Sequence, residues 1–266
     1  MSRASSSRLR GRVPVLAASG LLTGGLVLVG SPAASAHAAF PSSDHARAGT
    51  GTLAEHPGQP SPQPAPVMPQ AYELAWLYRH MAGASLEQTF MAGMIPHHAM
   101  AIAMAREELA KGVHPQLKAM AQQIITSQQQ DIAQMRSWLQ QWYGMTQEQA
   151  LAAAPAQARA LIDQMGAMMQ TQMVAPMQQA PAGEQTDLTF LRLMIPHHEM
   201  AIIEARAAAP RFAHPQLSMF AGHIITSQLS EVGQMRRWLH EWYGPSAGVP
   251  VRTPAGPGGT IVSHRR

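Results

Sequence analysis

Apolar residues recur at alternating steps of three and four through most of the chain between residues 71 and 244. In the stretch 114–144 the apolar or semi-polar positions are 117, 121, 124, 128, 131, 135, 138 and 142. This spacing places one stripe of a helix against its neighbours, as in a helical bundle. Because no segment alternates with the period of two that a strand requires, the pattern predicts an all-α protein.

The same pattern occurs twice, at a spacing of 100 residues. Met-Ile-Pro-His-His stands at 94–98 and again at 194–198, and the register continues without a gap through the tryptophans of both copies. Each copy, 86–144 and 186–244, predicts one helical hairpin. Because neither hairpin can bury its apolar stripe alone, we expect a ferritin-like four-helix bundle built from two tandem hairpins with pseudo-twofold symmetry.

The segments between and before the copies are also helical in pattern. Residues 71–81 predict a short opening helix, and the connector 145–185 predicts a helix followed by a loop. The connector carries four methionines on one stripe, which are Met165, Met168, Met169 and Met173. Core packing is the favoured interpretation of this stripe, and a transfer surface for Cu(I) is the alternative.

The two ends of the chain have a different character. Residues 1–36 combine arginines without acids, an apolar stretch and an Ala-Ser-Ala site, which predicts a cleaved export signal. A retained membrane anchor is the alternative. Residues 37–70 and 245–266 are rich in Pro and Gly and are predicted to be disordered. We therefore expect a secreted or periplasmic protein with no membrane association after cleavage.

Composition narrows the function. Without the four arginines of the signal, basic and acidic residues balance, so the chain lacks the charge for a nucleic-acid partner. Cysteine is absent, which excludes disulfides, thiolate metal sites and cysteine nucleophiles. The chain has 19 Met and 13 His residues. Outside the cytoplasm, a protein that binds a soft metal without thiols would use thioether and imidazole groups.

The repeated motif supplies these donors on one helical face. Positions i, i+3 and i+4 lie together, so Met94 projects with His97 and His98, and the second copy does the same with Met194, His197 and His198. A buried histidine is usually satisfied by a backbone carbonyl, but two pairs in register favour metal ligation. Pro96 and Pro196 either kink these helices or mark their first turn.

The second helix of each copy interrupts its apolar seam with an amide, an acid and a thioether. These residues are Gln128, Asp131 and Met135, and in the second copy Gln228, Glu231 and Met235. An acid on a buried seam needs a partner, which can be a metal or an imidazole. A salt link from Asp131 to a histidine would satisfy both groups without any ion.

The joint pattern Phe-x-x-x-Met-Ile-Pro-His-His, His-Pro-x-Leu and Gln-x-x-[Asp/Glu]-x-x-x-Met-x-x-Trp-Leu resembles the ferritin-like family catalogued as domain of unknown function three-hundred-five. The resemblance covers residues 86–244. It implies an exported helical bundle, and some members are implicated in copper binding or resistance. For this chain it implies histidine ligands with soft thioether donors, which are His97, His98, His197 and His198 with Met94, Met135, Met194 and Met235.

The sequence leads to three hypotheses about the function. The favoured hypothesis is a copper-binding protein that sequesters or hands on Cu(I), with Cu(II) or zinc as further cargo and a copper-handling protein as a partner if copper is handed on. A carboxylate-bridged di-metal oxidase is the enzymatic alternative, but the seam offers it only Asp131 and Glu231. The third is a structural or interaction bundle whose histidines are satisfied internally. The pattern does not indicate an oligomeric state.

Overall fold

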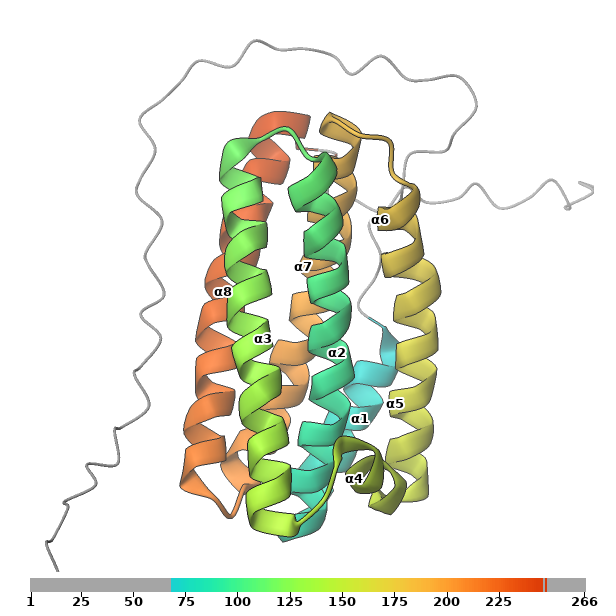
Figure 1. Cartoon of the computed structure of the whole chain (residues 1–266), viewed down its shortest axis with the longest axis vertical. Helices are drawn as coiled ribbons and strands as arrows, with labels where there is room; N and C mark the ends of the chain where they lie inside the picture. Colours follow the sequence, from blue (N-terminus) through green and yellow to red (C-terminus); the bar gives the residue numbers. More distant parts are fainter. Residues whose placement is uncertain (1–67, 246, 248–266) are drawn as a thin grey trace, which may run out of the picture. The chain divides into compact units, whose positions relative to one another are not determined.

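A computed structural model describes residues 68–245 and 247, and within them all regular structure is helical (Figure 1). The long helices are α2 (Gly83–Lys111), α3 (Pro115–Tyr143), α7 (Glu184–Ala208) and α8 (Pro215–Tyr243). α2 packs on α3, α7 packs on α8, and α2 and α7 contact each other. This arrangement confirms the all-α bundle of two helical hairpins. No helix among the described residues is long and apolar enough to cross a membrane.

The connector is more helical than its sequence predicted. It forms α4 (Gln147–Ala153), α5 (Ala156–Met169), a π-helical turn (Gln170–Val174) and α6 (Ala175–Gln179). A nearly continuous helical segment runs from Ala156 to Gln179, with the π turn directly before the part that contains Pro176, and the predicted loop is short, at residues 180–183. A wider turn accommodates a proline because the ring removes one backbone donor and crowds the preceding carbonyl.

The remaining short elements are α1 (Pro69–His80) and a 3₁₀ turn (Ala209–Arg211) after α7. α1 begins at Pro69, slightly earlier than the predicted opening helix and inside the segment that was predicted to be disordered. The predicted signal and nearly all of the two predicted disordered segments lie outside the described residues. Pro96 and Pro196 lie inside α2 and α7, so the mid-helix interpretation of these prolines is the correct one.

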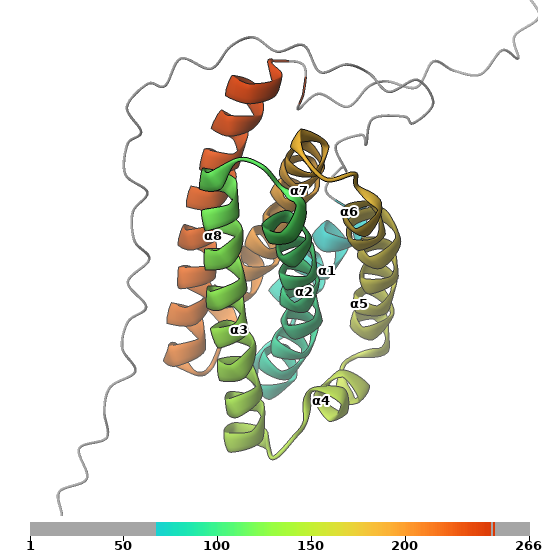
Figure 2. The same ribbon diagram turned by 45° about the horizontal axis from the view of Figure 1, so that its top comes forward.

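The helices form three layers with α2 and α7 in the middle, as Figures 1 and 2 show. α3 and α8 cover one side, where Trp138 of α3 meets Phe220 of α8 edge to face. α1, α5 and α6 cover the other side through contacts with α2 and α7. Consequently α2 is buried around its circumference, and every residue from 89 to 95 is inaccessible. This explains why two consecutive histidines are both buried, although their directions differ by about 100° on a helix.

The helix ends are fixed by contacts that cross between the copies. Glu87 of α2 accepts hydrogen bonds from the backbone N–H and ring Nδ1 of His214, both at 2.7 Å, and from the Tyr143 hydroxyl. In the other direction Asp187 of α7 accepts hydrogen bonds from the backbone N–H groups of residues 113 and 114 and from the ring of His114. Each acid therefore caps the second helix of the other copy. An acid is also favourable at a helix N-terminus, where the helix dipole is positive.

In both of these contacts a tryptophan ring stacks on the histidine. The ring of Trp142 stacks on His214 at a centroid distance of 3.9 Å, and Trp242 stacks on His114 at 3.8 Å. We call these two arrangements the cross-copy clasps: Glu87 with Tyr143, Trp142 and His214, and Asp187 with Trp242 and His114. Because each clasp joins the start of one copy to the hairpin turn of the other, α2 and α7 run antiparallel.

The pKa of Glu87 reflects its clasp. Burial acts to raise the pKa of this carboxyl, but the backbone N–H of His214 and the hydrogen bonds from Tyr143 and the His214 ring outweigh burial and lower the pKa below its usual value. A lowered carboxyl pKa stabilises the fold fully above the ordinary carboxyl pKa, and this contribution is lost as the pH falls through the lowered pKa. Glu87 therefore contributes to stability at neutral pH and not in acid.

Glu87→Gln tests this clasp. At pH 7 the substitution should lower the free energy of unfolding by about 1–3 kcal/mol, because it removes a charged acceptor of several hydrogen bonds. The difference from the unmodified protein should shrink as the pH falls below about 4. Denaturant unfolding at several pH values measures it, with the exposed Glu73→Gln as control. A difference that does not change with pH would contradict the role of the charge.

Candidate metal site

The centre of the bundle is occupied by two histidines from different copies. His97 of α2 and His197 of α7 face each other with ring centroids 3.9 Å apart and planes tilted by 44°. Their side chains are essentially inaccessible, at 2% and 0% exposure. Within each copy the neighbouring histidine ring is farther away, at 6.2 Å for His98 and 6.1 Å for His198. The duplicated motif thus forms one four-histidine cluster across the two copies.

The two central imidazoles lack ordinary partners. Among the described residues, neither ring nitrogen of His97 or of His197 has a well-formed hydrogen bond, although the backbone of His97 lies close to the ring of His197. Burial and the nearby imidazoles lower the pKa of both residues well below the usual value, and the backbone of His97 only partly opposes the shift for His197. Both rings are therefore neutral at physiological pH, which is the form that binds metal ions. A buried polar group without a partner is unfavourable, so the protein maintains this pair against a free-energy cost.

The second histidine of each pair contacts an acid of the following helix. Nε2 of His98 lies 3.3 Å from Asp131 Oδ2, and Nε2 of His198 lies 2.7 Å from Glu231 Oε2. These are the histidine–acid links that the sequence left open as an alternative to metal ligation. In both residues Nδ1 is buried and has no hydrogen-bond partner. Glu231 thus forms a hydrogen bond with one nitrogen of His198, whereas Asp131 lies near Nε2 of His98 without a well-formed hydrogen bond to it.

The predicted thioether donors are all inside the same core. Met94, Met135, Met194 and Met235 are fully buried. Met94 and Met194 stand one helical turn before the central histidines, and Met135 and Met235 stand one turn after the acids that hold His98 and His198. Each copy therefore provides sulfur, imidazole nitrogen and carboxylate oxygen from two adjacent helices.

The described residues offer fewer carboxylate ligands at the bundle centre than imidazole and thioether ligands. No group of three or more His, Asp or Glu side chains within residues 68–245 is arranged to hold a metal ion, so neither the four histidines nor the carboxylates form a complete site by themselves. The carboxylate-bridged centre that a ferritin-like oxidase requires is therefore not assembled in this part of the chain. A metal bound here would draw on thioether sulfur in addition to imidazole.

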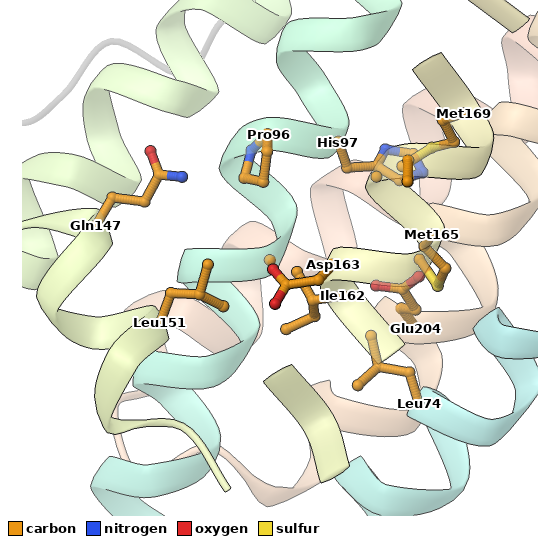
Figure 3. Close-up of a pocket in the computed structure, with 13 residues that line it drawn as sticks. Leu74, Pro96, His97, Gln147, Leu151, Ile162, Asp163, Met165, Met169 and Glu204 are labelled. Carbon is orange, nitrogen blue, oxygen red and sulfur yellow. The ribbon is translucent and has the colours of Figure 1, made fainter. Parts of the chain in front are cut away.

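A buried acid beside the cluster was not identified from the sequence. Glu204 of α7 is 2% exposed, its Oε1 has no hydrogen-bond partner, and burial raises its pKa to about 8. It lines a cavity of about 240 Å³ together with His97, Met165 and Met169 (Figure 3). The first copy has Met104 at the equivalent position, so an acid replacing a methionine on an apolar stripe was the available signal.

The acids of the cross-copy clasps were also missed. Glu87 and Asp187 stand 100 residues apart, in the same register as His114 and His214. Their repetition was visible, but their pairing was not, because each acid contacts the copy to which it does not belong. Two tryptophans near the helix ends, Trp142 and Trp242, stack on these histidines.

The chain belongs to the family described as "Domain of unknown function (DUF305)", which matches residues 38–138 and 87–239. It is similar to CopM in its Cu(II)-bound form, with 32% identity, coverage of 59% of this chain and 97% of that one, and a TM-score of 0.49. A DUF305 protein from Streptomyces coelicolor is 21% identical, with coverage of 59% and 93% and a TM-score of 0.51. The latter likeness supports the fold.

A curated relative comes from a virus. Protein L153 of Acanthamoeba polyphaga mimivirus is 42% identical over 53 residues, which are 20% of this chain. The aligned segment spans about a third of that protein, 35% of its length.

Glu204→Gln tests the buried carboxyl. A raised carboxyl pKa stabilises the fold fully below the ordinary pKa, and the contribution is lost as the pH rises toward about 8. Between these limits the unmodified protein should lose about 1.4 kcal/mol of stability per pH unit relative to the Gln variant. Denaturant unfolding of both proteins at pH 5, 7 and 9 measures the difference. Parallel stability curves would show that Glu204 is solvated or paired.

Proposed function

We propose that this protein binds copper outside the cytoplasm and sequesters it or hands it on, with Cu(I) as the favoured state. The observation that supports this proposal is the central pair of His97 and His197, which are neutral, buried and without hydrogen-bond partners. A structural role would be served better by apolar residues, which pack without leaving polar atoms unpaired. A metal ion would give these nitrogens the partner that the protein does not provide.

The donor set favours copper over harder metals. Imidazole and thioether ligands together select Cu(I) among the metals of proteins, whereas carboxylates favour harder ions. The chain contains no cysteine, and thioether is stable in oxidising compartments where thiols form disulfides. The predicted export signal is consistent with such a compartment. CopM has been captured with Cu(I), Cu(II) and silver, but the donors of this chain, not that likeness, carry the proposal.

We assign roles to the candidate residues as follows. His97 and His197 are the principal ligands, and Met94 and Met194, one turn before them on the same helices, are thioether donors. His98 and His198 are further imidazole ligands through their Nδ1 atoms, which have no hydrogen-bond partner among the described residues. Met135 and Met235 add thioether donors. Asp131 and Glu231 fix the orientation of the imidazoles, and they become direct ligands only for Cu(II) or zinc.

The main alternative is a bundle without metal. It is favoured by the acids beside His98 and His198: Glu231 forms a hydrogen bond with Nε2 of His198, and Asp131 lies 3.3 Å from Nε2 of His98. It does not account for the central pair, whose four ring nitrogens have no partner. Copper binding by variants of the central pair therefore separates the two functions.

Replacing His97 and His197 together by Ala should abolish the tightest Cu(I) binding while the helical content is retained. The variant loses both unpartnered imidazoles and keeps the acid-linked histidines. Anaerobic titration with a competing Cu(I) chelator gives the affinity and the stoichiometry, and circular dichroism verifies the fold. The exposed His80→Ala is the control. Unchanged tight binding in the double variant would refute the assignment of the central pair.

Asp131→Asn and Glu231→Gln should weaken Cu(II) or zinc binding more than Cu(I) binding. A carboxylate is a hard ligand, and it matters less to a soft ion. Parallel titrations with the three ions on the same variants compare the losses. Equal losses for all three would mean that the acids act only by orienting His98 and His198.

A further inference from the structure

The connector completes a chamber beside the histidine cluster. Its cavity of about 240 Å³ lies between α2, α5 and α7 and is lined by His97, Met165, Met169 and Glu204 among others. Figure 3 shows the side chains of His97, Met169, Met165 and Glu204 gathered along one side of the cavity, with Gln147 and Leu151 opposite. A water molecule takes about 30 Å³, so the volume is ample for an ion.

We propose that this chamber is a second Cu(I) site, in which the thioethers of Met165 and Met169 and the imidazole of His97 bind the ion and Glu204 balances its charge. The proposal extends the proposed copper function to residues of the connector. It shares His97 with the central pair and does not involve His197, which does not line the cavity. The site therefore lies on the connector side of the cluster.

The ligands converge from two helices. Met165 and Met169 are one helical turn apart on α5, so their side chains share a face, and each is only 3% exposed. On the same side of the cavity, His97 of α2 has no hydrogen-bond partner among the described residues at either ring nitrogen. Two thioethers and one imidazole are a donor set suited to a soft monovalent ion.

The acid points to a cation. Glu204 is almost completely buried, and its Oε1 has no hydrogen-bond partner in the chamber wall. A buried acid without a partner takes its neutral form, and a cation bound beside it allows it to lose the proton and become charged. In a low-dielectric chamber, a carboxylate stabilises a bound cation far more than it would in water.

Ordinary core packing accounts for the other connector methionines but not for these two. Met173 and Met177 are fully buried and do not line the cavity, as expected for residues that fill a core. Met165 and Met169 instead border open space, although a flexible thioether usually fills such gaps. Met173 and Met177 can therefore serve as matched controls for Met165 and Met169.

The two copies differ at the chamber in a way that keeps it open and charged. Gly93 lines the cavity, and the second copy has Leu193 at the equivalent position. A Cβ atom at Gly93 would come within 3.1 Å of Ile162 Cδ1, so a larger residue would push into the chamber wall. Glu204 replaces the Met104 of the first copy. Both departures from the repeat lie at one cavity.

The chamber also reaches the surface. Asp163 and Ala167, which line it from α5, are exposed residues. Asp163 places a negative charge at the opening, which attracts cations toward it. An ion entering here would meet Met165 and Met169 before it reaches the buried imidazole of His97.

The test uses Ag(I), a redox-inert substitute for Cu(I), and protein labelled with ¹³C at the methionine methyl groups. On addition of Ag(I), the methyl signals of Met165 and Met169 should shift in the unmodified protein and also in His197→Ala. The signals of Met173 and Met177 should stay in place. This measurement requires no change to the chamber, so it does not depend on the folding of a ligand variant.

A second measurement counts bound ions. Met165→Leu with Met169→Leu should lose one equivalent of Ag(I), whereas the matched Met173→Leu with Met177→Leu should lose none. Leu conserves the apolar volume, so both variants are expected to fold. In the otherwise unmodified protein, Glu204→Gln should weaken Ag(I) binding in the chamber about tenfold, because the substitution removes the negative charge.

The outcomes separate the chamber from the central pair. Methyl signals of Met165 and Met169 that do not move at saturating Ag(I), or an unchanged count in their Leu variant, would overturn the chamber site. If that happens while His197→Ala still loses an ion, the central site stands alone. If His197→Ala binds like the unmodified protein while the Leu variant loses an ion, the chamber stands and the central assignment fails.

Discussion

Burial of two neutral imidazoles face to face, without hydrogen-bond partners, is the constraint on which the rest of the structure depends. His97 and His197 can be buried only because α2 and α7 are covered on both sides. α3 and α8 provide one cover, and α1 with the connector provides the other. Removing water from the rings keeps them neutral and leaves their nitrogens unpaired. Packing thus creates the chemical state that a soft metal requires.

The duplication supplies rigidity as well as ligands. Each copy places an acid at the start of its first helix, and that acid binds the histidine that begins the second helix of the other copy. The two clasps fix the antiparallel register of α2 and α7 at both ends, so the motifs of the two copies meet at the centre. A shift by one turn, about 5 Å, would separate His97 from His197. Ligand position and fold stability therefore depend on the same repeat.

The sequence predicted the helices well, but it did not predict which residues of other helices would pack around them. The hairpins, the mid-helix position of Pro96 as one of two options, and the link between Asp131 and a histidine all follow from local spacing. The connector has the helix and the following loop that the sequence predicts, but a segment with two prolines does not show by itself how long that helix is or that it will cover α2. Glu87 was missed because its partner His214 lies 127 residues away, and Glu204 because its Oε1 has no hydrogen-bond partner among the described residues. Aligning the two copies identifies the residues that both contain, but only the packed structure shows which of these residues contact each other.

The most direct test of the account is X-ray absorption spectroscopy of the purified protein loaded anaerobically with one equivalent of Cu(I). The account predicts a low-coordinate ion with both imidazole nitrogen and thioether sulfur among its ligands, because these are the donors buried at the bundle centre. A spectrum with light-atom ligands only, or copper that is removed by simple dialysis, would contradict the central claim that this core is built to hold Cu(I).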